Sequence, residues 1–150
     1  MKRLSLVLNS FLPGSERIEF PKNQSISLKQ KFNDLIIEKD SNYIGKITTG
    51  GEVDFLGSKL KSQISFKGFK LNGYGDKEIS IKMPTRKSKA FCQSIDLDVF
   101  YGEKRIAYFG SVSISAFRSR EYILIFKSTV DVELATFLLI YITDNITDIF

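Results

Sequence analysis

The chain has 150 residues, of which 43% are hydrophobic and 13% aromatic, and its formal net charge is +5 at pH 7. This composition excludes a disordered chain and is sufficient for one domain, residues 1–150, with a hydrophobic core. The sequence contains no histidine, which excludes Ser-His and Cys-His pairs and histidine metal ligands, and its single cysteine excludes an intrachain disulfide and a cysteine zinc site.

The beginning of the chain alternates apolar and polar residues, with Leu4, Leu6 and Leu8 on one side. A secretory signal needs about 7–15 consecutive apolar residues, so we read this segment as a first strand. No stretch of the sequence reaches the length of about 18 apolar residues that spans a bilayer. We therefore expect a cytoplasmic protein that is not transmembrane and that can sit peripherally at a membrane.

Strand patterns continue to about residue 127. Residues 25–29 and 79–83 alternate apolar with polar side chains, as half-buried strands do. Turn residues separate such runs, for example Asp40-Ser41-Asn42, Gly50-Gly51 and Tyr101-Gly102-Glu103-Lys104. The spacing of these runs predicts about ten to twelve strands.

Two further runs of alternating residues make predictions, one for individual side chains and one for a strand. Ile64 and Phe66 alternate with polar neighbours, so we expect Phe66 in the core, while the position of Phe69 stays open. Val112 and Ile114 alternate with serines, which predicts a further strand.

The last part of the chain has a different pattern. Residues 131–147 contain no glycine or proline, and Asp131 and Glu133 suit the N-terminal end of a helix. We predict a helix at about 131–146, although β-branched residues such as Ile140 leave a strand open as the alternative.

This helix is apolar in every direction from Leu134 to Ile142. A helix of this kind must be enclosed by protein, because it is too short to span a membrane. In a chain of strands, the enclosing structure is a closed sheet, which also removes exposed strand edges. The predicted fold is therefore mainly β: an antiparallel barrel of about ten to twelve strands that encloses a hydrophobic C-terminal helix.

Three stretches of the sequence resemble the tubby C-terminal-like superfamily, which includes the tubby domain, the phospholipid scramblases and the plant LURP-one-related proteins. Leu35 to Ile47 and Phe100 to Ala107 resemble hairpins of that family, and Tyr122 to Phe126 followed by Asp131 to Asp144 resembles its final strand and core helix. The resemblance implies the barrel fold. It also implies a role at membranes, because the tubby domain binds phosphoinositides through basic residues; none of those residues is carried over to this chain.

Basic residues are concentrated in one part of the sequence. Residues 59–89 contain nine basic and two acidic residues, a net charge of +7, whereas residues 128–150 contain four acidic residues and no basic one. Such a concentration attracts anionic lipid headgroups or nucleic-acid phosphates. The alternative is that these are solvated side chains that protect sheet edges from aggregation. The predicted anion site consists of Lys59 and Lys61, which share one strand face, together with Lys67, Lys70, Arg86, Lys87 and Lys89.

The sequence thus predicts a non-enzymatic binding or scaffold module, without cofactor or metal, that engages anionic membrane lipid or a protein partner. The alternative function is a basic β domain that binds nucleic acid, in which aromatic residues near the lysines would stack on bases; Phe66, Phe69 and Tyr74 lie nearby in the sequence, although Phe66 is expected in the core. A carboxylate-dependent enzyme is a third hypothesis, because Asp96 and Asp98 lie on the same face of one strand. A solvated strand face is the ordinary explanation for that pair.

Overall fold

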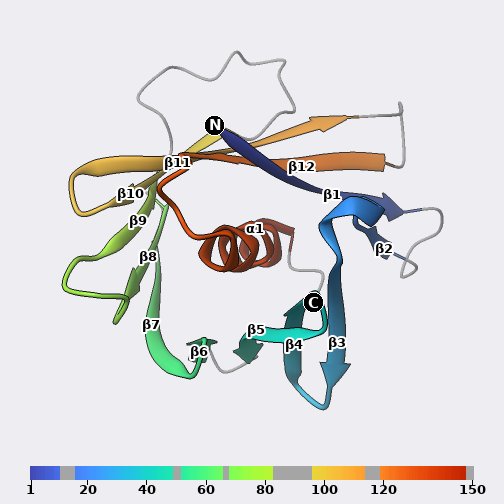
Figure 1. Ribbon diagram of the computed structural model, residues 1–150, viewed down its shortest axis with the longest axis horizontal. Coiled ribbons are helices and arrows are strands. Elements are labelled where there is room, and N and C mark those ends of the chain that lie inside the picture. Colours follow the sequence, from blue (N-terminus) through green and yellow to red (C-terminus); the bar gives the residue numbers. More distant parts are fainter. Residues whose placement is uncertain (11–15, 49–51, 66–67, 83–95, 114–118, 148–150) are drawn as a thin grey trace.

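The computed structural model describes residues 1–10, 16–48, 52–65, 68–82, 96–113 and 119–147. These residues form twelve strands, the short 3-10 helix η1 and the C-terminal helix α1 (Figure 1). The elements are β1 (Lys2–Ser10), β2 (Glu16–Glu19), η1 (Lys22–Gln24), β3 (Ile26–Lys31), β4 (Asp34–Lys39), β5 (Asn42–Thr48), β6 (Glu52–Phe55), β7 (Ser58–Ser65), β8 (Gly68–Asn72), β9 (Ile79–Lys82), β10 (Asp96–Tyr101), β11 (Lys104–Ser113), β12 (Ser119–Phe126) and α1 (Val132–Thr147).

All twelve strands belong to one antiparallel sheet, in the order β2-β1-β12-β11-β10-β9-β8-β7-β6-β5-β4-β3. Strands β3 to β12 are neighbours both in sequence and in space, and β1 then pairs with β12. The predicted mainly-β fold with a C-terminal helix is confirmed. Among the described residues no ladder joins the edge strands β2 and β3, so closure into a barrel stays a prediction.

The C-terminal helix lies inside the curve of this sheet. Figure 1 shows strands on several sides of α1, and the helix contacts β1, β4, β5 and β12. Every side chain from Leu134 to Ile142 is at most 3% exposed. Burial of each large apolar side chain contributes about 1.5–3 kcal/mol, so α1 is the centre of the core. The helix predicted for this segment is therefore confirmed, and the strand alternative is wrong.

Two threonines lie in this buried helix without leaving polar groups unpaired. The hydroxyl of Thr136 donates to the carbonyl of Val132 at 2.8 Å, and that of Thr143 donates to the carbonyl of Leu139 at 2.7 Å. Each hydroxyl thus uses a carbonyl one turn earlier in its own helix. This local bonding lets a polar side chain point into an apolar environment.

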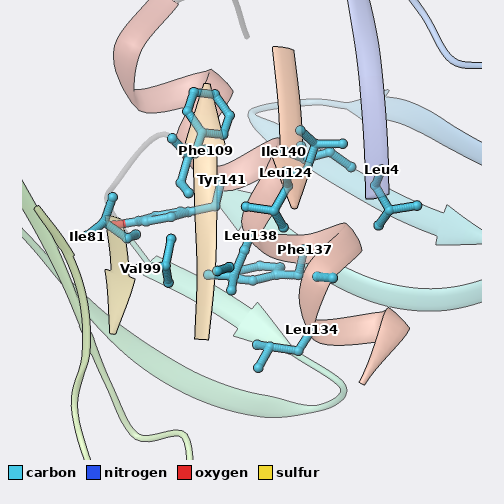
Figure 2. Packing of buried hydrophobic residues seen from close by; sticks show 14 of the residues in the cluster. Leu4, Ile81, Val99, Phe109, Leu124, Leu134, Phe137, Leu138, Ile140 and Tyr141 are labelled. Atoms are coloured by element: carbon cyan, nitrogen blue, oxygen red, sulfur yellow. The ribbon is translucent and has the colours of Figure 1, made fainter. Parts of the chain in front are cut away.

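The sheet approaches α1 closely at Gly45 of β5. A Cβ atom at this position would lie 2.9 Å from Cδ2 of Phe137 and 2.6 Å from the carbonyl oxygen of Asp54. Both distances are too short for a real Cβ, so only glycine fits between the helix and β6. Figure 2 shows Phe137 and Tyr141 of α1 among strand residues such as Val99 and Ile81.

Aromatic rings form a continuous row from one end of the sheet into the core. Tyr101 packs edge-to-face on Tyr74, and Tyr74 packs on Phe55, each at 5.7 Å between ring centroids. Phe55 lies 5.3 Å from Phe137, which stacks on Tyr141 at 5.9 Å. Aromatic pairs of this geometry contribute about 0.5–1.5 kcal/mol each beyond the area that they bury.

Gln24 of η1 is bound on two sides: its side chain binds β1, next to the edge strand β2, and its backbone carbonyl binds Lys39 of β4, next to the edge strand β3. Its amide oxygen accepts from the backbone N–H of Ser5 at 2.9 Å, and its amide nitrogen donates to the carbonyl of Ser5 at 2.8 Å. The Gln24 carbonyl accepts from Nζ of Lys39 at 2.6 Å. Gln24 and Ser5 are only 9% and 7% exposed. A side-chain amide therefore bonds to β1 as the peptide group of an added strand would, while its own backbone is bound to the end of β4.

The predicted turns at Asp40-Ser41 and Gly102-Glu103 are confirmed as two-residue connections between paired strands. Asp40 and Ser41 both have positive φ, 52° and 65°, as turns that join strands tightly require. Residues 49–51, with the predicted turn Gly50-Gly51, lie outside the described residues.

In β11 and β7, the alternation of apolar and polar residues in the sequence does not match the alternation of buried and exposed side chains at every position. The strand predicted here is confirmed by the last residues of β11, but Val112, an apolar member of the pattern, is 53% exposed, whereas Ser111 is 2% exposed. The inward face of β11 is fixed by Ala107 and Phe109, and Ser111 continues their period of two. Ile64 near the end of β7 is 66% exposed. Phe66 and Ile114 lie outside the described residues.

Candidate anion-binding surface

The antiparallel topology divides the connections between strands into two groups. One end of the sheet is where the odd-numbered strands finish, that is β1, β3, β5, β7, β9 and β11. The next strand in the sequence begins at the same end in each case. The connections at that end are residues 11–15, 32–33, 49–51, 66–67, 83–95 and 114–118. The connections at the opposite end are residues 20–25, 40–41, 56–57, 73–78, 102–103 and 127–131.

These two groups of connections carry opposite charge in the sequence. The first group contains five basic residues, Lys67, Arg86, Lys87, Lys89 and Arg118, and no acidic one. The second group contains three basic residues and five acidic ones, Asp40, Asp76, Glu78, Glu103 and Asp131. We call the first the basic end and the second the acidic end. Four members of the predicted anion site, Lys67, Arg86, Lys87 and Lys89, belong to connections of the basic end and lie outside the described residues.

The other three members lie together on the outer face of the sheet. Lys59 and Lys61 are exposed on either side of the buried Leu60, as predicted, and Lys70 is exposed on the neighbouring strand β8. Each of them has a carboxylate nearby: Lys59 is in register with Asp54, Lys61 is in register with Glu52, and Nζ of Lys70 lies 3.6 Å from Oε1 of Glu78. Opposite charges in direct register attract each other across a ladder. Neighbouring carboxylates therefore offset part of the positive charge of these three lysines.

Asp96 and Asp98 lie on one outward face of β10, on either side of the buried Leu97. Asp96 accepts a hydrogen bond from the hydroxyl of Tyr108, and Oδ1 of Asp98 lies 3.5 Å from Nη1 of Arg105. Both carboxylates thus have partners on the neighbouring strand β11. Among the described residues no group of three or more His, Cys, Asp or Glu side chains forms a cluster that holds a metal ion.

Two of the aromatic residues considered for base stacking, Phe69 and Tyr74, have partners inside the protein. Phe69 packs edge-to-face on the buried Tyr141 at 6.4 Å between centroids, which settles its open position in favour of the core. Tyr74 lies between Phe55 and Tyr101 in the aromatic row. Both rings are half-buried and packed against the core, which leaves less of each ring for stacking on nucleic-acid bases.

The acidic end is held together by many contacts between its own residues. The hydroxyl of Tyr101 donates to Oδ1 of Asp76 at 3.2 Å, and the N–H of Gly102 donates to the carbonyl of Glu78 at 2.8 Å. Nζ of Lys77 lies 6.0 Å from the centre of the Tyr101 ring. The N–H of Asp40 donates to the carbonyl of Ser25 at 2.9 Å, beside Gln24. The connections at this end therefore stabilise the fold.

Phe32 is a candidate functional residue that sequence reasoning missed. It begins the two-residue turn between β3 and β4 at the basic end, and it is 90% exposed. Its φ of 57° lies in the left-handed region, which costs a bulky residue about 1–2 kcal/mol relative to glycine. The sequence gives only a weak signal: Phe32 lies in the short gap between the strand patterns of residues 25–29 and 34–38, where a turn is expected.

No helix among the described residues has both the length and the apolar character that crossing a membrane requires. Comparison with family models, with curated proteins and with solved structures finds no match to this chain. The resemblance to the tubby C-terminal-like superfamily therefore stays a prediction.

Proposed function

We propose that this protein is a non-enzymatic binding module that attaches to anionic membrane surfaces through its basic end. The observation that carries the proposal is the charge difference between the two ends of one antiparallel sheet. Five basic residues and no acidic one follow the strand ends at one side, while acidic residues are in excess at the other. Each basic residue near an anionic leaflet contributes about 1 kcal/mol to attachment, so five suffice for reversible binding.

Lipid is favoured over nucleic acid by the residues that accompany the charge. Phe69 and Tyr74, two of the candidates for base stacking, pack against the core. In contrast, Phe32 in a connection of the basic end is 90% exposed, and Ile64 and Val112 on the adjoining strand ends are 66% and 53% exposed. Exposed apolar side chains beside basic residues suit the boundary between headgroups and acyl chains.

The proposal includes a sheet that closes into a barrel around α1, as the resemblance to the tubby-like proteins implies. It is supported by Gln24, which binds Ser5 near one edge of the sheet and Lys39 near the other. Such a sheath would fix the strand ends from which the connections of the basic end start, because α1 and the strands around it share one core.

The test is cosedimentation with vesicles of equimolar phosphatidylserine and phosphatidylcholine, compared with vesicles of phosphatidylcholine alone. We expect binding only to the anionic vesicles, and weaker binding as the salt concentration rises. The double variant Lys87→Glu/Lys89→Glu should bind more than about 30-fold more weakly, because the loss of two attractive charges alone accounts for that factor and the two new carboxylates repel the anionic surface. The matched control is Lys22→Glu/Lys104→Glu, which changes the net charge by the same amount at exposed positions of the acidic end.

Equal losses in both double variants would mean that only the total charge matters, which contradicts attachment through one end. If the wild-type chain stays in solution with anionic vesicles and instead shifts RNA or DNA in a salt-dependent manner, the nucleic-acid function replaces the proposal. If it binds neither, the remaining function is a protein-binding module.

A further inference from the structure

Phe32 lies at the most exposed point of the β3–β4 hairpin. The two residues before it and the one after it are exposed as well, and in Figure 1 this turn lies at the rim of the molecule, away from α1. Lys31 and Asp34 are in register as the pair that closes the turn. The side chain of Phe32 is thus held outside the core by a short turn.

Phe32 stabilises neither the core nor the turn. At 90% exposure it makes no substantial packing contact, and its positive φ is a conformation that glycine or asparagine adopts more easily. Leu56 at the acidic end shares the positive φ, at 50°, but is only 53% exposed. An aromatic side chain that is strained and almost fully solvated is explained by a contact outside the protein.

The neighbours of Phe32 indicate what kind of surface it meets. Lys29 and Lys31 lie on the same face of β3, two residues apart, and both are exposed. The Lys29 side chain remains 66% exposed although its Nζ lies 3.2 Å from Oε1 of Glu38. Long lysine side chains can keep their charge among phosphates while a neighbouring apolar residue goes deeper. This arrangement suits a bilayer interface with anionic headgroups.

We infer that Phe32 is a membrane-inserting residue, which enters the boundary between headgroups and acyl chains while Lys29 and Lys31 contact lipid phosphates. This inference rests on the proposed function and adds to it the part of the protein that enters the lipid. The β3–β4 hairpin thereby has a role in lipid insertion, which is separate from the electrostatic attraction by the basic residues of the other connections.

The chain contains no tryptophan, so Phe32→Trp gives a single fluorescent reporter at the tip. With phosphatidylserine-containing vesicles, we expect its emission to move to shorter wavelength and to be quenched by brominated acyl chains. The matched control is Leu56→Trp, which places the same reporter in a turn with positive φ at the acidic end. Its emission should not change with the same vesicles.

Phe32→Gly removes the side chain and suits the turn. It should bind the vesicles about tenfold more weakly, because an apolar anchor is lost, while its thermal unfolding midpoint stays the same or rises. If the Phe32→Trp variant sediments with the vesicles and its emission does not change, the insertion is overturned and the proposed function stays intact. Absence of cosedimentation would overturn both.

Discussion

The two ends of this sheet differ in what their residues do for the fold. At the acidic end, Tyr101, Asp76 and Glu78 bond across the connections, and Gln24 binds both β1 and the end of β4. At the basic end, the described turn presents Phe32 to solvent in a strained conformation. If the proposed function holds, stability depends mainly on the acidic end and binding on the basic end, so the two properties can be changed separately.

We expect the largest loss of stability from a substitution in α1, because this helix is the centre of the core beneath the strands that join both ends of the sheet. Phe137 is fully buried and contacts the rings of Phe55 and Tyr141. Phe137→Ala should lower the free energy of unfolding by about 3–5 kcal/mol, through lost burial and the cavity that remains. Urea unfolding followed by circular dichroism measures this loss. A loss within the range of a surface substitution would show that α1 is not the centre of the core.

Gln24→Ala tests the acidic end. The substitution leaves the backbone N–H and carbonyl of the buried Ser5 without their partner, so we expect a loss of about 1–3 kcal/mol. Gln30→Ala is the control, because Gln30 is exposed on the neighbouring β3, and it should change stability by less than about 0.5 kcal/mol. The interpretation of Gln24 as the link between β1 and β4 is wrong if both variants unfold at the same urea concentration.

A smaller effect is expected from the core tyrosines at alkaline pH. Burial raises the pKa of Tyr141 and of Tyr122 above the ordinary value for tyrosine. The folded chain therefore holds these protons more tightly than the unfolded chain does. This contribution to stability is complete below about pH 10 and is lost as the pH rises through the folded-state pKa values.

Unfolding midpoints between about pH 8 and pH 11 check this dependence. Tyr141→Phe should give a shallower decline over that range, since phenylalanine has no proton to lose. An identical decline in the variant would assign the alkaline instability to other groups.

Much of the fold could be predicted from sequence because its signals are local. The period of two in residues such as Leu4 and Leu6, the turn at Asp40-Ser41 and the all-round apolar helix need no knowledge of distant contacts. The burial of Ser111 and the exposure of Val112 could not be predicted from their polarity, because their environment is set by neighbouring strands. Ser111 continues the inward face begun by Ala107 and Phe109, and Val112 faces solvent on the other side.

The candidate site was less predictable, since charge in sequence is not charge on a surface. Lys59 and Lys61 share a face as expected, but the register with β6 sets Asp54 and Glu52 opposite them. Strand register depends on the whole ladder and leaves no mark in a short run of sequence. Gln24 and Phe32 were missed for the same reason: a single residue has no periodicity, and its role follows from what surrounds it.

The most direct test of the account measures stability and vesicle binding together in two variants, Gln24→Ala and Phe32→Gly. We predict that Gln24→Ala unfolds at lower urea concentration and still binds phosphatidylserine-containing vesicles at a temperature where it is folded. Phe32→Gly should keep its stability and bind them about tenfold more weakly. The assignment of stability to one end and binding to the other is contradicted if each variant changes both properties together.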